Sequence, residues 1–210
     1  NMLDGLQPTD FSMTVKEFIS MVKRYGLDIS NLPDGEFDDP LGESTGAADI
    51  FAQTGGVMEA AIRTAGVWLD GDAPWNINWE TGYDSGIKES TVTIGGITLN
   101  LCIASGLANA GKVLERVRSG EKNYHFIEIM ACPGGCLNGG GQPIAKDGKY
   151  AETLAKRRAG IQAVDKSKSA RISCDSKSIQ TLYEEFLGAP GSELAHHLLH
   201  TSYADDSETI

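Results

Sequence analysis

Two cysteines four residues apart are the part of this chain with the clearest capacity for chemistry. Cys132 and Cys136 enclose Pro133-Gly134-Gly135, and three more glycines follow at positions 139–141. Glycine at this density lets the backbone approach a bulky group closely and presents amides without side chains in the way. Thiolates among such amides suit an anionic iron–sulfur cluster, whose potential depends on hydrogen bonds to its sulfurs. Two cysteines are half of a ligand set, so a pair of packed thiols is the alternative.

The stretch before these cysteines predicts the element that positions them. Residues 124–130 form a short run rich in β-branched and aromatic side chains, which is typical of a buried strand. Open α/β sheets bind ligands beyond the carboxyl ends of their strands, and Cys132 follows this strand almost directly. The sequence therefore predicts that one end of a sheet carries the cysteine motif.

A second pair of strands precedes this one. Gly95-Gly96 divides residues 91–94 from residues 97–104 and predicts a two-residue hairpin. A helix that ends near Ser119 then connects the second hairpin strand to the strand at 124–130. Strand–helix–strand over about 30 residues is a βαβ unit, so these two strands should be parallel with a right-handed crossover.

Helices should flank this sheet and follow it. Thr14 and Glu17 form a capping box that opens a helix to near Arg24, and Thr54-Gly55-Gly56 opens another to near Trp68. Further helices are expected at residues 151–164, 176–187 and 192–200. The predicted fold class is α/β: a mixed, partly parallel sheet with a βαβ unit flanked by helices, then a C-terminal helical segment.

The glycines at positions 55 and 56 allow two interpretations. Small residues at a helix start can bring backbone N–H groups against an anionic ligand. They can equally let the helix pack close to a strand. The sequence alone leaves both interpretations open.

Residues 128–136 and 139–143 resemble the third cysteine motif of the iron-only (FeFe) hydrogenases. Three other stretches agree with this family in register, at residues 39–60, 182–188 and 196–201. The resemblance extends from near Thr14 to near Tyr203. In that family the active-site cluster takes four cysteines, from a T-S-C-x-P-x-W motif, an M-P-C-x-x-K-x-E motif and the motif above. The first two motifs are absent here, so the chain resembles the C-terminal half of a hydrogenase catalytic domain.

The resemblance implies two regions and a partner. Residues 1–149 would be the C-terminal half of the large-subunit catalytic domain, and residues 150–210 a helical segment like the small subunit. The implied partner is the remaining half of the catalytic domain with the two other cysteine motifs, together with an electron carrier such as ferredoxin or another redox subunit. Residues 51–65 and 97–104 are apolar enough to need layers on both sides, and we expect the missing half to cover them.

The implied cofactor is the H-cluster, a 4Fe–4S cluster joined through one cysteine sulfur to a diiron centre with CO, CN and dithiolate ligands. By position, Cys132 and Cys136 would ligate the 4Fe–4S cluster, with Cys136 as the bridging residue. Met130 would pack against the diiron centre, and Phe51 with the Thr54-Gly55 backbone would form the far wall of its pocket. The implied activity is the reversible oxidation of dihydrogen to protons and electrons, with no proton donor assigned to this chain.

Two related functions compete with catalysis. A sensory hydrogenase would use slow turnover to report dihydrogen to a signalling domain. A hydrogenase-like iron–sulfur assembly protein would bind only ordinary clusters. The match of residues 44–46 and 54–56 argues against the assembly protein, because a diiron pocket has no use there.

Composition restricts the partners and the compartment. The formal net charge of −11 argues against nucleic acid and anionic lipid. We expect no membrane span, because the sequence has no apolar run of about 18 residues, and it has no signal-peptide pattern. Cysteines that bind metal are typical of a reducing compartment, so we expect the protein in the cytoplasm. Export of an assembled complex to the periplasm is the alternative.

Several other groups have plainer interpretations. The acids at positions 34, 36, 38 and 39 lack the alternating spacing of a calcium loop. His196 and His200 are spaced like a metal-binding pair, but amphipathic packing of their helix is simpler. Cys102 is expected to be a packed core residue and Cys174 a bystander in a polar loop. The basic residues 156–158 are expected to form a solvated helix face.

Overall fold

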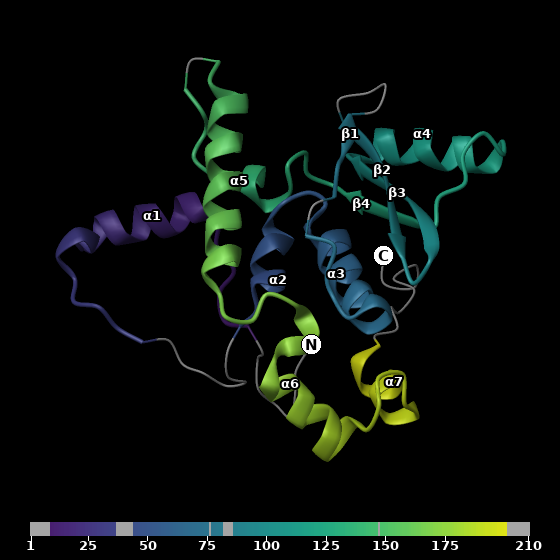
Figure 1. Ribbon diagram of the computed structural model, residues 1–210. Coiled ribbons are helices and arrows are strands. Elements are labelled where there is room, and N and C mark those ends of the chain that lie inside the picture. The colour runs from purple at the N-terminus through teal and green to yellow at the C-terminus, as the bar shows by residue number, and fades with distance from the viewer. Residues whose placement is uncertain (1–8, 37–43, 76, 82–85, 147, 201–210) are drawn as a thin grey trace, which may run out of the picture.

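A four-stranded mixed sheet forms the centre of the computed structural model, which describes residues 9–36, 44–75, 77–81, 86–146 and 148–200 (Figure 1). Its strands, in the order β1-β2-β3-β4, are β1 Glu80–Thr81, β2 Ile87–Ile94, β3 Ile97–Ser105 and β4 Phe126–Met130. Strands β1, β2 and β3 are antiparallel neighbours, and β4 pairs with β3 in parallel. The sheet is therefore mixed and partly parallel, which confirms the predicted fold class.

The hairpin between β2 and β3 is confirmed. Ile94 pairs with Ile97 across the turn, and both Gly95 and Gly96 have positive φ, at 59° and 75°. A two-residue hairpin turn with positive φ at both positions favours glycine, because side chains are strained there. This turn fixes which residue of β2 faces which residue of β3.

The βαβ unit is confirmed as well. Helix α4, Leu107–Arg118, connects β3 to β4, and the parallel register places Leu101 beside Phe126 and Ser105 beside Met130. Ser105 and Met130 are the last residues of their strands. The carboxyl ends of both strands therefore meet at the same end of the sheet, directly before the cysteine motif.

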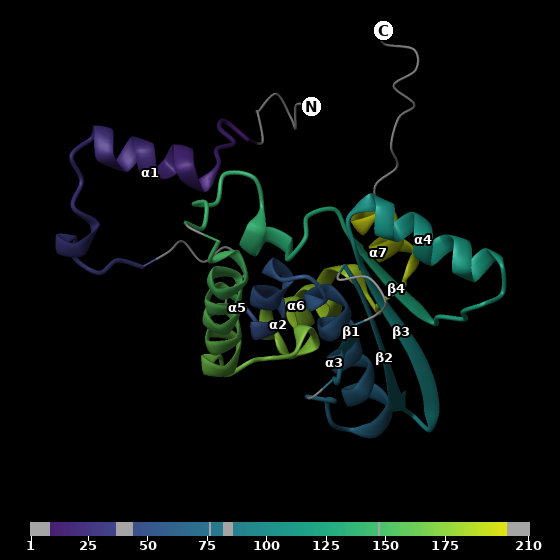
Figure 2. The same cartoon turned by 90° about the horizontal axis from the view of Figure 1, so that it is seen from above.

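Helices cover both faces of this sheet. Helix α3, Gly56–Asp70, lies on one face and α4 on the other (Figure 2). Alternate residues of β3 divide between them, because successive side chains of a strand point to opposite faces. One cluster joins α3 to the sheet through Met58, Ile62, Ile94, Leu101 and Ile103. The other joins α4 to the sheet through Ile87, Cys102, Ala104 and Val113.

This packing corrects one expectation. The apolar stretch at 97–104 does need layers on both sides, but α3 and α4 of this same chain supply them. Leu101 to Ala104 are buried, and only the start of the strand, including Ile97, is exposed. In the other stretch, Phe51 and Val57 are partly open to solvent.

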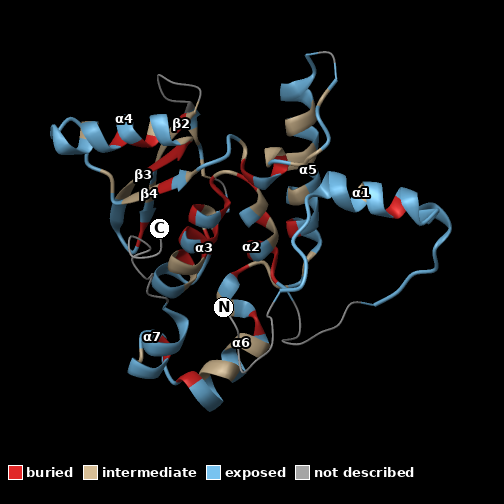
Figure 3. Cartoon of the chain, turned by 180° about the vertical axis from the view of Figure 1, so that it is seen from behind, coloured by how far each residue is buried: buried red, intermediate tan, exposed pale blue. Residues whose placement is uncertain are grey.

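Helix α1, Val15–Arg24, projects from the molecule and is exposed along most of its length (Figure 3). Its start is attached to the glycine-rich loop, because the Lys16 amide donates to the Gly141 carbonyl at 3.0 Å. Its capping box is present: the Thr14 amide donates to Glu17 Oε2 at 2.7 Å and the Glu17 amide donates to Thr14 Oγ1 at 3.3 Å. The apolar side chains of this helix are largely uncovered, since Phe18 and Met21 are exposed and only Val22 is buried.

The C-terminal part is helical, as predicted. Helix α5, Tyr150–Ser167, packs beside the short helix α2, Gly46–Asp49 (Figure 1). Helix α6, Lys177–Leu182, continues as a π-helical turn at Tyr183–Leu187, and α7 covers Glu193–Leu199. Short 3₁₀ turns occur at Ile29–Asn31, Ile50–Ala52, Gly135–Asn138 and Ser173–Asp175.

A buried ionic network attaches α5 to α3. Arg63 on α3 donates to both carboxylate oxygens of Asp165 on α5, at 2.9 Å and 3.0 Å, and Arg171 donates to the same carboxylate at 2.6 Å. Arg63 and Asp165 are each 2% exposed. Trp75 covers both guanidinium groups, at 5.1 Å and 4.3 Å from its ring centroid. Such bidentate, charge-assisted bonds fix orientation as well as distance.

Close approach of backbone supports this network. A Cβ placed on Gly46 at the start of α2 would lie 2.2 Å from Asp165 Oδ1, so only glycine lets α2 come this near to α5. Burial by itself would raise the pKa of Asp165, but hydrogen bonds from Arg63 and Arg171 outweigh it and hold the pKa below its ordinary value of 3.8. This contribution to stability is therefore present above about pH 4 and is lost as the pH falls through the lower pKa of the folded state.

Asp165→Asn should lower the free energy of unfolding by about 3–5 kcal/mol, because it leaves buried guanidinium charge without its partner. The variant should also lose less stability than the parent on acidification from about pH 5 to pH 2, since the titrating group is gone. Urea denaturation at several pH values measures both. Glu152→Gln, an exposed carboxylate on the same helix, is the matched control and should cost under about 0.5 kcal/mol. Equal stability of the two variants would contradict the role of the network.

Candidate functional site

The cysteine motif is a tight turn that begins where β4 ends. The Met130 carbonyl accepts from the Gly106 amide at 2.7 Å, which ties the end of β4 to the start of α4. Gly134 and Gly135 both have positive φ, at 85° and 72°, so this turn requires glycine at two successive positions. The Gly135 amide donates to the Cys132 carbonyl at 2.9 Å and closes the turn. Both thiols, Cys132 and Cys136, are left exposed.

A second loop packs directly against this turn. A Cβ placed on Gly135 would lie 2.8 Å from the Ala52 carbonyl oxygen and 2.9 Å from the Thr54 amide nitrogen. Gly135 is buried beneath this loop. The structure therefore brings the stretch at 51–55 against the cysteine motif, although about 80 residues separate them.

A buried carboxylate fixes that loop to the strand. Glu128 lies in the middle of β4 and is 8% exposed. Its Oε1 accepts from the Gly55 amide at 2.6 Å and its Oε2 from the Met58 amide at 2.8 Å, so it caps the N-terminus of α3. Both interpretations of the glycines therefore hold. The Gly55 and Met58 amides bind a carboxylate, which is a side chain of this chain. A Cβ placed on Gly55 would lie 2.7 Å from Ile103 Cδ1 on β3, so the helix start also packs close to a strand.

Helix α5 holds the other side of the motif. Arg157 donates to the Leu137 carbonyl at 2.7 Å and to the Pro143 carbonyl at 2.6 Å. One guanidinium group thus spans the glycine-rich loop that follows Cys136. The prediction that this basic stretch faces solvent is correct for Lys156, which is exposed. It is wrong for Arg157, because the guanidinium of this residue turns toward the loop and donates to its carbonyls.

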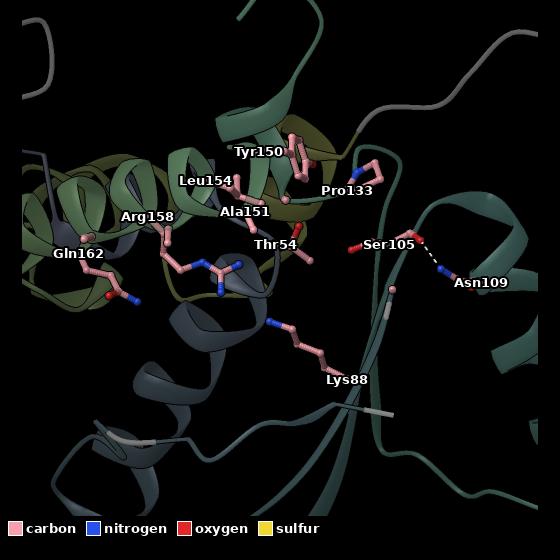
Figure 4. Close-up of a pocket in the computed structure, with 14 residues that line it drawn as sticks. Thr54, Lys88, Ser105, Asn109, Pro133, Tyr150, Ala151, Leu154, Arg158 and Gln162 are labelled. Atoms are coloured by element: carbon pink, nitrogen blue, oxygen red, sulfur yellow. Dashed lines mark hydrogen bonds between the residues drawn. The ribbon is translucent and has the colours of Figure 1, made fainter. Parts of the chain in front are cut away.

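A cavity of about 610 Å³ opens beside the motif (Figure 4). It lies between the turn, the ends of the strands and α5. Its walls include Thr54, Lys88, Ser105, Pro133, Tyr150 and Arg158. The Oγ1 atom of Thr54 is buried without a hydrogen-bond partner among the described residues. The cavity thus has an unsatisfied hydroxyl in its wall next to the cysteine turn.

The predicted pocket residues occupy different environments. Thr54 and Gly55 lie beside the motif, Thr54 on the cavity wall and Gly55 buried and bonded to Glu128. Met130 is partly buried at the end of β4, two residues before Cys132. Phe51 is 45% exposed, next to the loop segment that touches Gly135. Their roles toward a cofactor stay predictions.

Some functional residues were not identified from the sequence. Glu128, Arg157 and Asp165 act over distances along the chain that local patterns do not show. The available signal was an acid inside an apolar strand, since Glu128 is flanked by Ile127 and Ile129. A charge in such a run implies a buried partner.

The remaining candidates take plainer roles. Cys102 lies on β3 and is fully buried against α4. Burial, with a smaller contribution from the charge of Glu89, raises the pKa of its thiol to about 11. Cys174 is partly exposed at a 3₁₀ turn. Within the described residues, no three His, Cys, Asp or Glu side chains gather as a metal site. The ring centroids of His196 and His200 lie 4.2 Å apart, with the rings tilted by 34°. Asp38 and Asp39 lie outside the described residues.

Gly135→Ala should destabilise the protein by about 1–3 kcal/mol, because the new Cβ would collide with backbone atoms that cannot move independently. Gly140→Ala in the same loop is the matched control, since a Cβ there meets nothing within 4 Å. Chemical denaturation of the two variants measures the difference. A Gly135 variant as stable as the Gly140 variant would show that the two loops are not packed as described.

Known proteins with similar sequences include hydrogenases and iron–sulfur assembly proteins. The NADP-reducing hydrogenase subunit HndD of Solidesulfovibrio fructosivorans is 44% identical over 203 residues, which are 96% of this chain and 34% of that protein. The periplasmic Fe hydrogenase large subunit of Nitratidesulfovibrio vulgaris is 46% identical over 142 residues, 67% of this chain and 34% of that protein. Protein NAR1 of Arabidopsis thaliana is 30% identical over 203 residues, 94% of this chain and 43% of that protein. The chain thus spans about a third to two fifths of these relatives.

A solved structure agrees with this similarity. An FeFe-hydrogenase whose structure describes stepwise H-cluster assembly, HydA(deltaEFG), superposes with a TM-score of 0.77 at 35% identity. The match covers 96% of this chain and 57% of that protein.

None of the helices described here has the length and apolar character that a membrane span requires.

Family models divide the chain in two. Residues 1–140 match the iron-only hydrogenase large subunit, C-terminal domain, and residues 151–206 match the iron hydrogenase small subunit. The first match alone covers more than half of the chain and includes the cysteine turn, the loop at 51–55 and the βαβ unit that positions them. This chain belongs to the iron-only hydrogenase family.

Proposed function

We propose that this chain supplies two of the four thiolate ligands of the catalytic iron–sulfur cluster of an iron-only hydrogenase. The observation that carries the proposal is the cysteine turn: Cys132 and Cys136 are exposed at a turn whose backbone is fixed on three sides. β4 leads into it, the loop at 51–55 packs beneath it and Arg157 spans the loop after it. Rigid backbone with free thiols is the arrangement that a cluster site needs.

The donor set fits half of such a site. Cys102 is buried in the sheet and Cys174 lies at a turn before α6, so neither joins the pair at the motif. A 4Fe–4S cluster takes four thiolates. We therefore propose that the remaining half of the catalytic domain supplies the other two, and that an electron carrier or redox subunit completes the system.

In this proposal each residue of the site has a limited task. Cys132 and Cys136 would hold the cluster, and Cys136 would also be a ligand of the diiron centre. The consecutive glycines at 134 and 135 keep side chains out of the way, and Glu128 holds the Gly55 end of the neighbouring loop in place. When bound, the H-cluster would supply the redox chemistry that interconverts dihydrogen with protons and electrons.

The pocket wall is part of the same proposal. We assign Met130 and Phe51 to contacts with the diiron centre, with the Thr54-Gly55 backbone beside them. Phe51 is partly exposed, so it can contact a group outside this chain. The division at residues 149 and 150 into a catalytic half and a small-subunit-like segment, and the cytoplasmic location, also stay predictions. No proton donor is proposed within this chain.

A second candidate function is iron–sulfur assembly. It is supported by relatives such as Protein NAR1 and the cytosolic iron–sulfur assembly component 3 of Bos taurus, each 30% identical to this chain. The hydrogenase relatives are more similar, at 44% and 46% identity. An assembly protein would hold ordinary clusters, so infrared carbonyl and cyanide bands in the complete protein would favour hydrogenase and their absence would favour assembly.

Cys132→Ser and Cys136→Ser in the complete enzyme should each abolish the infrared bands of the diiron centre and lower hydrogen evolution by more than about 100-fold, since a ligand matters more than its outer-shell partners. Cys174→Ser is the matched control and should leave both unchanged. Iron content, infrared spectra and activity are measured on the same samples. Wild-type bands in either motif variant would refute the ligand assignment.

The chain on its own should evolve no hydrogen from a reduced dye, even when produced with the maturation machinery. Two thiolates leave the cluster half ligated and open to solvent and oxygen. Adding a partner chain with the two missing cysteine motifs should restore hydrogen evolution and iron content together. Hydrogen evolution by the purified single chain would contradict the proposal.

A further inference from the structure

Two cations face each other inside the cavity beside the cysteine motif. Lys88 comes from β2 and Arg158 from α5, and both side chains extend into the same space (Figure 4). Both are only partly exposed. In a protein of net charge −11, two partly buried positive charges directed at one another need an explanation.

Neither cation has an acidic partner in the described part of the chain. A smaller cavity adjoins the one beside the motif and is lined by Lys88 and Arg158 as well. The carboxylate of Glu59 also lines it, but this carboxylate already accepts from Arg63 at 2.6 Å. Burial and the charge of Arg158 lower the pKa of Lys88. The pair as described is therefore electrostatically unfavourable, because like charges near each other in a partly desolvated site repel.

Other polar atoms at the same place are unsatisfied. The Nε atom of Arg158 and the Oγ1 atom of Thr54 are both buried without a hydrogen-bond partner among the described residues. Gln162, one turn after Arg158 on α5, lines the same two cavities. A buried donor without an acceptor costs free energy, and one anion at this point would accept from both the Arg158 Nε–H and the Thr54 hydroxyl.

The space available indicates the size of that anion. A cavity of about 70 Å³ lies among Thr54, Lys88, Arg158 and Gln162 and adjoins the larger cavity. Since a single water molecule needs about 10–15 Å³ of such space, the cavity has room for a small group such as a carboxylate. A carboxylate has this size and matches the planar fork of a guanidinium.

We propose that Lys88 and Arg158, with Thr54 and Gln162, bind one carboxylate group. Its source is an aspartate or glutamate side chain from the part of the enzyme beyond these 210 residues, or a free small carboxylate. The first source suits the larger cavity, which runs from the two cations to Pro133 and Gly134 at the cysteine turn. The inference rests on the proposed function only if the carboxylate is a side chain of the enzyme, because that source assumes that the remaining half of the catalytic domain lies against the cysteine turn.

The sign of a stability change tests the proposal in the complete enzyme. Lys88→Met and Arg158→Met should each lower the midpoint of thermal unfolding by at least about 2 °C, because each removes a partner of a bound anion. If no anion is bound, the same changes relieve repulsion and raise the midpoint or leave it unchanged. Lys88→Arg retains the charge and should stay near the parent. Lys156→Met, an exposed lysine on the same helix, controls for the loss of one positive charge.

Acetate in the buffer separates the two sources. If each substitution lowers the unfolding midpoint by the same amount with and without acetate, the bound carboxylate is a side chain of the enzyme. A parent midpoint that rises with acetate, while the Lys88→Met midpoint does not, indicates a free carboxylate. Midpoints of both variants at or above that of Lys156→Met in both buffers would overturn the proposal. Iron content of the same samples reports separately on the cysteine site, so failure of either idea is visible alone.

Discussion

The hydrogen bonds of one buried carboxylate are the constraint on which the rest of the site depends. Glu128 stands in the strand that leads to the cysteines, and its two oxygens bind amides 70 and 73 residues earlier in the chain. A carboxylate removed from water is costly unless it is fully hydrogen-bonded, and bonds to charged groups are about twice as strong as neutral ones. Any shift of α3 along β4 would break both bonds at once. The distance between the loop at 51–55 and the turn at 132–136 is therefore set by side-chain chemistry as well as by apolar packing.

The fold around that constraint follows from patterns that lie within a few residues. Gly95-Gly96 predicted the hairpin, because the turn itself requires positive φ at both positions. The apolar run before Cys132 predicted a strand, and the connecting helix predicted a parallel partner, since right-handed βαβ crossovers are nearly universal. Local geometry of this kind is encoded locally, so the sequence was sufficient for it.

The side-chain hydrogen bonds that connect one element to another were not predictable in the same way. Glu128, Arg157 and Asp165 each bind partners on another element, and nothing in the sequence near them identifies those partners. The apolar strand at 97–104 was misjudged for a related reason: its need for two layers was clear, but which segment supplied the second layer was not. Helix α4 supplies it, which a count of apolar residues does not reveal. The cysteines were identified because their spacing and glycines are local.

The network between Arg63 and Asp165 also has a consequence for the order of events during synthesis. The two residues are 102 positions apart, so a ribosome adding about 5–20 residues per second delivers Asp165 roughly 5–20 s after Arg63. Throughout that interval the Arg63 guanidinium lacks Asp165, and Glu59, one turn away on the same helix, is its available carboxylate partner among the described residues. Helix α3 can pack on the sheet during this time, but its outer side can close only when α5 has emerged. The cysteine turn is thus complete in sequence before the helix that holds it exists.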